Sequence, residues 1–381
     1  MPTSWKVFNP GGTHRVVVTR ELPGDRWVRI LTDAGCRVEV EQSEGSLSRA
    51  DLLAAIGTSC RGLIAQLSER MDRETLTALK TAGGVVYSNY AVGYNNVDVD
   101  AATSLGIPVG NTPGVLTEAT AELAAGLTLA AARRIVEADA YTRAGKFTGW
   151  GMRLFLGELL NRKTLGVVGV GRIGSAYARM LVQAHRMDLL YLSRSPKPLL
   201  EREYEAFNAF LRANGERPVV VRRAAGIEEL LRDADVVGLF PSLNESTTHL
   251  LTAERLALMK PEAVLVNASR GPVIDEAALA AHCRTHPTFR AALDVYEREP
   301  ALEPGLAGLA NVILMPHIGS GTGWTREAMG VIAARNIAGG LAHAPVWTGS
   351  DMSVFVGDDP PAACPSIVNA SELGLPRLGP A

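Results

Sequence analysis

The chain has 381 residues, of which 47 % are hydrophobic and 20 % charged, a composition of ordinary globular domains that excludes collagen-like, coiled-coil and broadly disordered chains. Its net charge of −2, from 38 basic and 40 acidic residues, gives no electrostatic basis for binding nucleic acid. The longest apolar run, 123–132, is far shorter than the roughly 20 residues that cross a bilayer. The four cysteines lack metal-ligand spacing, so neither a zinc site nor a disulfide framework is expected. We therefore expect a soluble intracellular protein without membrane or nucleic-acid partners.

The first part of the chain, 15–109, alternates short apolar segments with helical ones. Strands are expected at 16–18, 37–40, 62–65 and 84–87, and helices at 25–34, 51–56 and 72–82. This alternation predicts a small parallel sheet covered on both faces.

A long alanine-rich helix is expected next, from about Glu118 to Ala144, with Thr117 as its N-cap and Gly145 at its end. Its small residues allow close packing against another backbone. The pattern leaves two interpretations open, a buried helix within one domain and a helix at a domain or subunit interface.

A second alternating region begins at Thr164. Six apolar runs follow, at 164–168, 189–192, 236–240, 263–266, 291–295 and 312–315. Helical segments lie between most of them, which is the pattern of a doubly wound α/β domain.

A glycine-rich turn in this region is expected to bind a dinucleotide. The run Gly169-Val170-Gly171-Arg172-Ile173-Gly174 follows an apolar strand and precedes a helix over 175–184. Glycine serves a tight turn at the first position, close approach of a pyrophosphate at the second and helix–strand packing at the third. The free N–H groups of the helix then face the phosphates. The alternative is a glycine-rich turn without a ligand.

The end of the next strand bears on the choice of cofactor. An NAD site usually places an acid there for the ribose 2′-hydroxyl, but this chain has Ser193-Arg194-Ser195. Arg194 can pair with a 2′-phosphate, and the two serines can donate to it. The sequence therefore favours NADP(H), with NAD(H) as the alternative if Arg194 is solvated or stacks on adenine.

Polar residues also follow the later strands of this domain. Arg270 and His317 follow two of these strands, and Asp294 lies at the end of a third. In a doubly wound sheet ligands bind beyond the carboxyl ends of the strands, so we expect these side chains to converge beside the cofactor.

These motifs resemble the D-isomer-specific 2-hydroxyacid dehydrogenases. The resemblance rests on Ser269-Arg270-Gly271, 294–300, 316–320, the loop 91–98 and the segment 111–118, in order from about Arg15 to Val346. Plant-type hydroxypyruvate reductases are the most similar members, sharing 8–10, 131–138, 171–180, 269–279 and an insertion at about 198–223. The resemblance implies an α/β fold of two Rossmann-like doubly wound parallel-sheet domains with a cleft between them.

The resemblance also implies the roles of the site residues. Arg270 would bind the carboxylate of a small 2-keto acid with the N–H groups of Val92 and Gly93, His317 would donate the proton, Glu299 would hold the other ring nitrogen, and Asp294 would orient the nicotinamide carboxamide. The residues expected to contact the cofactor are Thr120, Gly169, Gly171, Arg172, Ile173, Gly174, Ser193, Arg194, Ser195, Pro241, Thr247, Ser269, Asp294, His317 and Gly319. No metal is expected.

The implied activity is reduction of hydroxypyruvate to D-glycerate and of glyoxylate to glycolate, of photorespiratory type. Another dehydrogenase of the family, such as a phosphoglycerate dehydrogenase, and a dinucleotide-sensing corepressor-like scaffold remain as alternatives. The expected domains are 1–117 with 325–350 for substrate and 118–324 for the dinucleotide, followed by a C-terminal tail, 351–381, in which 358–365 is rich in Pro and Ala.

A homodimer is expected on the helix from Glu118 to Ala144. Trp150 is interpreted either as a cover for a neighbouring subunit's site or as a packed hinge residue. Plant peroxisomal relatives carry an acid after the second strand and end in Ser-Lys-Leu, whereas this chain has Ser193-Arg194 and ends in Leu378-Gly379-Pro380-Ala381. We therefore expect the cytosol or an organelle matrix, the mitochondrion if a presequence has been removed, rather than the peroxisome.

Overall fold

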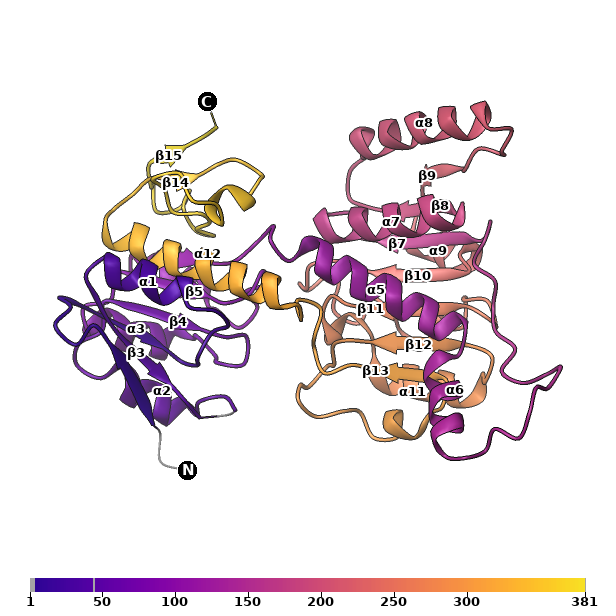
Figure 1. The fold of residues 1–381 in the computed structure, drawn as a ribbon, viewed down its shortest axis with the longest axis horizontal. Helices are drawn as coiled ribbons and strands as arrows, with labels where there is room; N and C mark the ends of the chain where they lie inside the picture. The colour runs from indigo at the N-terminus through magenta and orange to yellow at the C-terminus, as the bar shows by residue number, and fades with distance from the viewer. Residues whose placement is uncertain (1–3, 44, 381) are drawn as a thin grey trace. The chain divides into compact units, whose positions relative to one another are not determined.

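The protein, seen in a computed structural model that describes residues 4–43 and 45–380, divides into two compact units (Figure 1). Unit 1 comprises Met1–Leu116 and Ser320–Ala381, and unit 2 comprises Thr117–Gly319. Each unit is built on a sheet with helices on both faces. The predicted fold class, two Rossmann-like α/β domains, is confirmed.

Unit 1 contains a six-stranded sheet in the order β1-β3-β2-β4-β5-β6. Its strands are β1 (Trp5–Phe8), β2 (His14–Val18), β3 (Cys36–Glu41), β4 (Gly62–Ala65), β5 (Val86–Asn89) and β6 (Val109–Gly110). The strands are parallel except β1, which pairs antiparallel with β3 and was not foreseen. The strand expected at 84–87 begins two residues later, because Gly84 and Val85 bond back to Leu79 and Arg61 before the ladder starts.

Helices cover both faces of this sheet because successive strand residues point to opposite sides. Val16 and Val18 pack with α1 (Arg26–Asp33) and α12 (Gly323–Leu341), whereas Val17 packs with α2 (Arg49–Ile56) and α3 (Arg73–Thr81). A short helix, α4 (Val99–Ser104), precedes β6.

The C-terminal segment expected as a tail, 351–381, is part of unit 1. It packs on unit 1, where Cys364, Ile367 and Ala370 are buried. The buried side chain of Asn369 accepts a hydrogen bond from the Val109 N–H at 2.9 Å and donates one to the Ile107 carbonyl at 3.0 Å. The segment thus satisfies backbone groups at the edge of the sheet, which composition does not reveal. Its strand β15 (Arg377–Leu378) pairs in parallel with β14 (Val346–Trp347), which lies just before the segment.

Unit 2 contains a seven-stranded parallel sheet in the order β13-β12-β11-β10-β7-β8-β9. Its strands are β7 (Thr164–Val168), β8 (Asp188–Leu192), β9 (Val221–Arg223), β10 (Val236–Leu239), β11 (Val264–Asn267), β12 (Arg290–Leu293) and β13 (Val312–Leu314). One face packs on α5 (Thr117–Ala132) and α7 (Arg172–His185). The other face packs on α9 (Ile227–Asp233), α10 (Ala253–Leu256) and α11 (Glu276–Thr285).

The long helix expected from Glu118 to Ala144 is two helices, α5 and α6 (Ile135–Arg143). The break lies at Arg134, which adopts a left-handed backbone conformation with φ of 56°. The Arg134 guanidinium pairs with Glu137 at 2.6 Å, and Glu137 also pairs with Arg290 at 3.2 Å. These ion pairs hold the break against the sheet. In α5 the small residues Ala121 and Ala124 are buried within the unit's own core.

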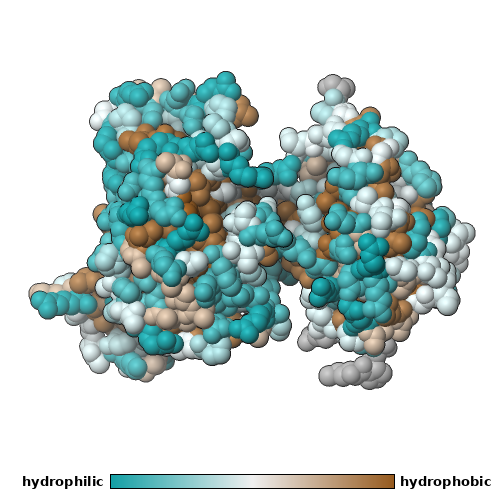
Figure 2. Space-filling view, turned by 180° about the vertical axis from the view of Figure 1, so that it is seen from behind, coloured by the Kyte–Doolittle hydropathy of each residue, from teal (hydrophilic) through white to brown (hydrophobic). Residues whose placement is uncertain are grey.

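Large apolar side chains remain exposed after this break. In unit 2 they include Phe147, and Trp150 and Met152 are 82 % and 81 % exposed. Hydrophobic areas interrupt the hydrophilic surface of both units (Figure 2). Trp150 is therefore not a packed hinge residue within its own unit.

The insertion at about 198–223 forms α8 (Pro198–Ala213) and the edge strand β9. β9 pairs with β8 in parallel, and Arg223 lies opposite Tyr191. The insertion therefore extends the sheet beside the end of β8.

Candidate functional site

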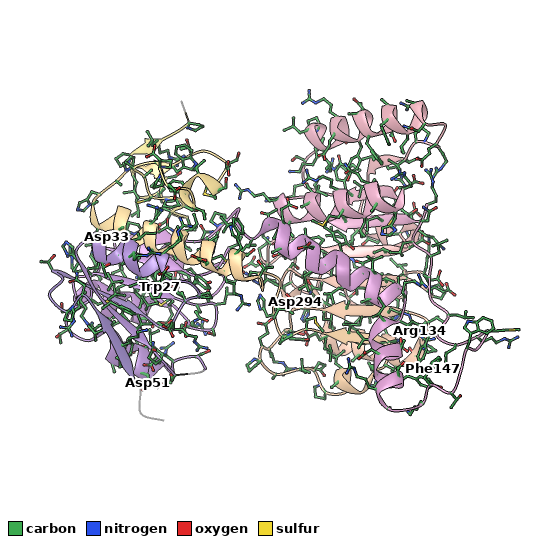
Figure 3. All side chains as sticks on the ribbon, viewed as in Figure 1. Trp27, Asp33, Asp51, Arg134, Phe147 and Asp294 are labelled. Atoms are coloured by element: carbon green, nitrogen blue, oxygen red, sulfur yellow. The ribbon has the colours of Figure 1, made fainter. Side chains whose placement is uncertain are left out.

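The site residues of unit 2 lie just beyond the carboxyl ends of its parallel strands. Gly169 follows β7, Ser193 follows β8, Asp294 follows β12, and His317 comes shortly after β13. Figure 3 labels Asp294 at this edge of the unit. Because the strands are parallel, residues far apart in the sequence meet at one edge.

His317 and Glu299 form a hydrogen-bonded pair. The distance from His317 Nδ1 to Glu299 Oε2 is 2.8 Å, and 32 % and 37 % of the two side chains are exposed. A carboxylate on Nδ1 places the ring's other nitrogen, Nε2, on the far side of the ring. The pair therefore orients an imidazole that can exchange a proton through Nε2.

The charges around Glu299 favour its ionised form. Burial opposes ionisation, but the hydrogen bond and charge of His317, the Tyr296 N–H at 3.0 Å and the charge of Arg270 outweigh it, so the pKa of Glu299 lies below its ordinary value of 4.5. An ionised Glu299 is an acceptor for the ring through Nδ1.

Arg270 supplies the positive charge beside this pair. Burial lowers the pKa of Arg270 and the charge of Glu299 opposes that shift, and arginine stays protonated under such conditions. Its Nη1 donates to the Ser269 carbonyl at 2.7 Å. Within the described residues no hydrogen bond engages its Nε or Nη2, so these donors are available for a carboxylate.

Asn267 shapes the loop that carries Arg270, a role that the sequence analysis missed. Its Nδ2 donates to the Arg270 carbonyl at 2.9 Å, and its Oδ1 accepts from the Ser269 hydroxyl at 2.8 Å. The hydroxyl of Ser269 is therefore engaged within the loop. A buried asparagine at the end of a strand was the available signal, since buried amides are rarely left unpaired.

Asp294 holds the turn that carries His317. Its two carboxylate oxygens accept the N–H groups of Ile318 and Gly319, each at 2.7 Å. Burial raises the pKa of Asp294 above its ordinary value of 3.8, against the opposing effects of these N–H groups and of the His317 charge. A Cβ on Gly319 would lie 3.1 Å from Asp294 and 3.2 Å from Thr120, so Thr120 borders the same turn.

The loops bearing Arg270 and Glu299 are packed together through Gly271. A Cβ at this position would lie 1.8 Å from the backbone carbon of Tyr296. Glu276, which is 3 % exposed, accepts the N–H of Glu297 at 2.7 Å. The backbones of the two loops are therefore in direct contact, and a hydrogen bond links them. Glu276 is a second residue that the sequence analysis missed.

The glycine-rich turn has the geometry of a phosphate cradle. Gly169 has φ of 91°, and its Cβ would lie 2.7 Å from the Phe240 carbonyl oxygen and 2.8 Å from Pro241 N. A Cβ on Gly174 would lie 2.2 Å from the Gly169 oxygen, whereas Gly171 faces open space. Gly171 is the N-cap of α7 and provides no side-chain cap. Arg172 and Ile173 therefore start a helix whose N–H groups are open to an anion.

The loop Ser193–Ser195 and the turn at Thr247 are partly engaged in local hydrogen bonds. Ser193 Oγ donates to the Ser195 carbonyl at 2.6 Å, and Thr247 Oγ1 donates to the Ser242 carbonyl at 2.8 Å. Arg194 is exposed, and its guanidinium has no partner among the described residues. It is therefore free to pair with an anion.

Val92 and Gly93 belong to unit 1. Their carbonyl oxygens accept from Asn111 Nδ2 and Asn89 Nδ2, each at 2.8 Å. No hydrogen bond engages their own N–H groups within the part of unit 1 that is described. This loop therefore presents two free backbone donors.

Comparisons with known proteins decide the family. Residues 125–319 match the NAD-binding domain of the D-isomer-specific 2-hydroxyacid dehydrogenases. The chain is 52 % identical over 379 residues to the peroxisomal glycerate dehydrogenase HPR of Arabidopsis thaliana, covering 98 % of both proteins. This chain belongs to the D-isomer-specific 2-hydroxyacid dehydrogenase family. The predicted membership is confirmed, and the chain is an oxidoreductase.

More distant dehydrogenases of this family share the fold. The chain is 39 % identical over 327 residues to a glyoxylate reductase of Thermococcus onnurineus, covering 85 % of this chain and 91 % of the relative. It also resembles the crystal structure of an NADPH-dependent glyoxylate/hydroxypyruvate reductase from Sinorhizobium meliloti in complex with NADP and malonate. That likeness has a TM-score of 0.70 at 27 % identity and covers 87 % of this chain and 95 % of that one.

The glycine-rich turn at 169–174 fits a nicotinamide dinucleotide. Its glycines leave no room for side chains at two positions and open space at the third, as close approach of a pyrophosphate requires. Across residues 4–43 and 45–380, no cluster of three or more His, Cys, Asp or Glu side chains could hold a metal ion. Over the same residues, no helix is long and apolar enough to span a membrane.

Proposed function

We propose that this dehydrogenase reduces hydroxypyruvate to D-glycerate, and glyoxylate to glycolate, with NADPH as the preferred reductant. The observation that carries the proposal is the His317–Glu299 pair at 2.8 Å with the Arg270 charge acting on it. Support for the substrates comes from the names of its relatives, a glycerate dehydrogenase and a glyoxylate reductase. Glycerate is the product of reducing the keto group of hydroxypyruvate.

Arg270 is proposed to bind the substrate. Its unengaged Nε and Nη2 form a planar fork that matches a carboxylate and polarises the neighbouring keto oxygen. The N–H groups of Val92 and Gly93 are proposed as further donors to the carboxylate. Charge and geometry together would hold the keto carbon in one orientation.

His317 is proposed as the general acid. When bound, the cofactor supplies a hydride to the keto carbon. The keto oxygen then becomes an alkoxide, and His317 delivers a proton to it from Nε2 while Glu299 stabilises the charged ring from Nδ1. Asp294 keeps His317 in place through the two N–H groups that follow it. Its carboxylate is also proposed to orient the nicotinamide carboxamide.

The preference for NADPH is proposed from the end of β8. Arg194 is exposed and unpaired among the described residues, and no acid stands at Ser193, Arg194 or Ser195 to repel a 2′-phosphate. One charge-assisted contact contributes roughly 1.5 to 3 kcal/mol. That corresponds to about a ten- to hundredfold difference in affinity, before solvent reduces it.

The test is a steady-state assay of both reduced cofactors with hydroxypyruvate, glyoxylate and 3-phosphohydroxypyruvate. We expect the highest kcat/KM with NADPH and hydroxypyruvate. The double variant Ser193→Asp with Arg194→Leu should reverse the cofactor preference while leaving the order of substrates unchanged. Equal or higher efficiency of the unmodified enzyme with NADH would contradict the cofactor proposal. Higher efficiency with 3-phosphohydroxypyruvate would contradict the substrate proposal.

A further inference from the structure

The inserted edge strand β9 ends beside the loop that follows β8. Arg223 is the last residue of β9 and lies opposite Tyr191 in the ladder. The next residue, Ala224, donates its N–H to the Tyr191 carbonyl at 2.8 Å. The parallel pairing therefore brings the insertion to the same edge of the sheet as Ser193, Arg194 and Ser195.

The Arg223 guanidinium clamps the backbone of this loop. Its Nε and Nη2 donate to the Ser193 carbonyl oxygen at 3.0 and 2.8 Å, and Nη2 also donates to the Arg194 carbonyl oxygen at 3.1 Å. Its Nη1 has no partner among the described residues. One arginine therefore covers two carbonyl oxygens and keeps one nitrogen free for a further acceptor.

These contacts change what the loop presents to an anion. Exposed carbonyl oxygens repel a phosphate, and a guanidinium bonded to them offsets that repulsion. In a trans peptide the C=O and N–H point to opposite sides, so the N–H groups of Arg194 and Ser195 turn away from Arg223. Neither N–H has a partner within the described chain, and both are available as donors.

The far side of the loop is anchored by the start of the insertion. Tyr191 donates its hydroxyl to Glu201 at 2.5 Å and accepts the N–H of Lys197 at 3.3 Å. The Glu201 carboxylate of α8 is thus engaged by a tyrosine. The loop from Ser193 to Lys197 is therefore held at both ends by residues that flank or belong to the insertion.

We propose that Arg223 is a specificity-determining residue for the 2′-phosphate of NADP(H), holding the Ser193–Ser195 loop and adding a second positive charge to that of Arg194. This inference rests on the proposed preference for NADPH. It assigns the insertion a role in cofactor selection, since β9 supplies the arginine.

Calorimetric titration of the full chain with two nucleotides tests the inference without catalysis. Adenosine 2′,5′-bisphosphate carries the 2′-phosphate, and 5′-AMP lacks it. The variant Arg223→Gln should bind the bisphosphate about tenfold more weakly, as expected for one partly exposed charge-assisted contact. Its affinity for 5′-AMP should change less than twofold. Arg223→Lys keeps the charge but not the fork, and should fall between the unmodified chain and Arg223→Gln.

Arg222→Gln is the matched control. Arg222 is the neighbouring residue on β9, points to the other face of the strand, and pairs with Glu229 and Asp233. Its replacement removes the same charge and should leave both affinities unchanged.

The outcomes distinguish a failure of the Arg223 role from a failure of the proposed NADPH preference. An equal loss of affinity for both nucleotides in Arg223→Gln, or no loss for either, would overturn the role of Arg223. If the unmodified chain binds the two nucleotides equally, the preference for NADPH fails, and this inference fails with it.

Discussion

His317 occupies a backbone conformation that few side chains adopt, with φ of 53°. Left-handed conformations are disfavoured for residues other than glycine, and the two N–H groups that follow His317 are both bound by Asp294. The Asp294 carboxylate therefore holds the turn in the conformation in which the His317 imidazole contacts Glu299. The position of the proposed acid depends on a buried charge next to it.

Replacement of His317 by alanine should remove the proton donor. We expect kcat to fall by roughly 10²- to 10⁴-fold, the usual contribution of general acid–base catalysis, while a fluorescence titration shows unchanged cofactor binding. His343 is a suitable control, since its φ is also 53° and it belongs to unit 1. His343→Ala should retain full turnover. Near-normal turnover in His317→Ala would rule out the acid role.

Glu299 should make stability depend on pH in a defined direction. Its pKa is lowered in the folded state, so its stabilising effect is fully present above the ordinary value of 4.5 and is lost as the pH falls through the lowered value. Glu299→Gln should therefore unfold at a lower temperature than the unmodified protein at neutral pH. That difference should shrink below pH 4.5. A difference that is constant with pH would show that the charge of Glu299 contributes nothing.

At the scale of elements, the loops that follow β11 and β12 are packed against each other. Gly271 allows them to meet, and Glu276 of α11 bonds the backbone between Tyr296 and Glu299. A displacement of one loop therefore moves both Arg270 and Glu299. This coupling explains why a glycine directly follows the arginine.

Gly271→Ala should disturb both loops, because its Cβ would lie 1.8 Å from Tyr296 backbone. We expect a loss of roughly 1 to 3 kcal/mol in the free energy of unfolding, the usual effect of overpacking, measured by urea denaturation. A fall in kcat/KM should accompany it. Gly308→Ala is the control, since nothing lies within 4 Å of that Cβ, and it should change neither quantity. Wild-type activity in Gly271→Ala would show that the loops move independently.

At the scale of the whole molecule, the exposed apolar side chains after α5 suggest a surface that a partner covers. They are Ile135, Val136, Phe147, Trp150, Met152, Leu154, Leu156 and Leu159. Figure 3 labels Arg134 where α5 and α6 meet and Phe147 beyond the end of α6. Eight exposed apolar side chains within residues 135–159 are a candidate interaction surface, since large exposed apolar areas commonly mark interaction sites.

We expect a second copy of the chain to cover this surface, giving a homodimer. Sedimentation at micromolar concentration should show twice the chain mass of 40.5 kDa. The double variant Trp150→Glu with Leu156→Glu should shift the protein to monomers. Leu199→Glu, an equally exposed position on α8, should not. A single 40.5 kDa species for the unmodified protein would contradict the dimer.

Local sequence patterns determined much of this protein. The apolar runs predicted β2 to β5 of unit 1 and β7, β8 and β10 to β13 of unit 2, because burial on two faces demands continuous hydrophobic segments. They did not predict the short or edge strands β1, β6 and β9. The glycine spacing predicted the cradle because only glycine fits its close contacts. The strand-end rule placed Arg270, Asp294 and His317 at one edge because parallel strands all end there.

The tertiary structure alone decided how distant segments meet. Nothing in the local pattern shows that Asn369 completes the edge at Val109, that Arg134 divides the long helix, or that Arg223 reaches back 30 residues to Ser193. Periodicity reports which face of an element is buried, over a few residues at a time. Side-chain hydrogen bonds across the sheet depend instead on strand order and register, which are set only when the whole chain has folded.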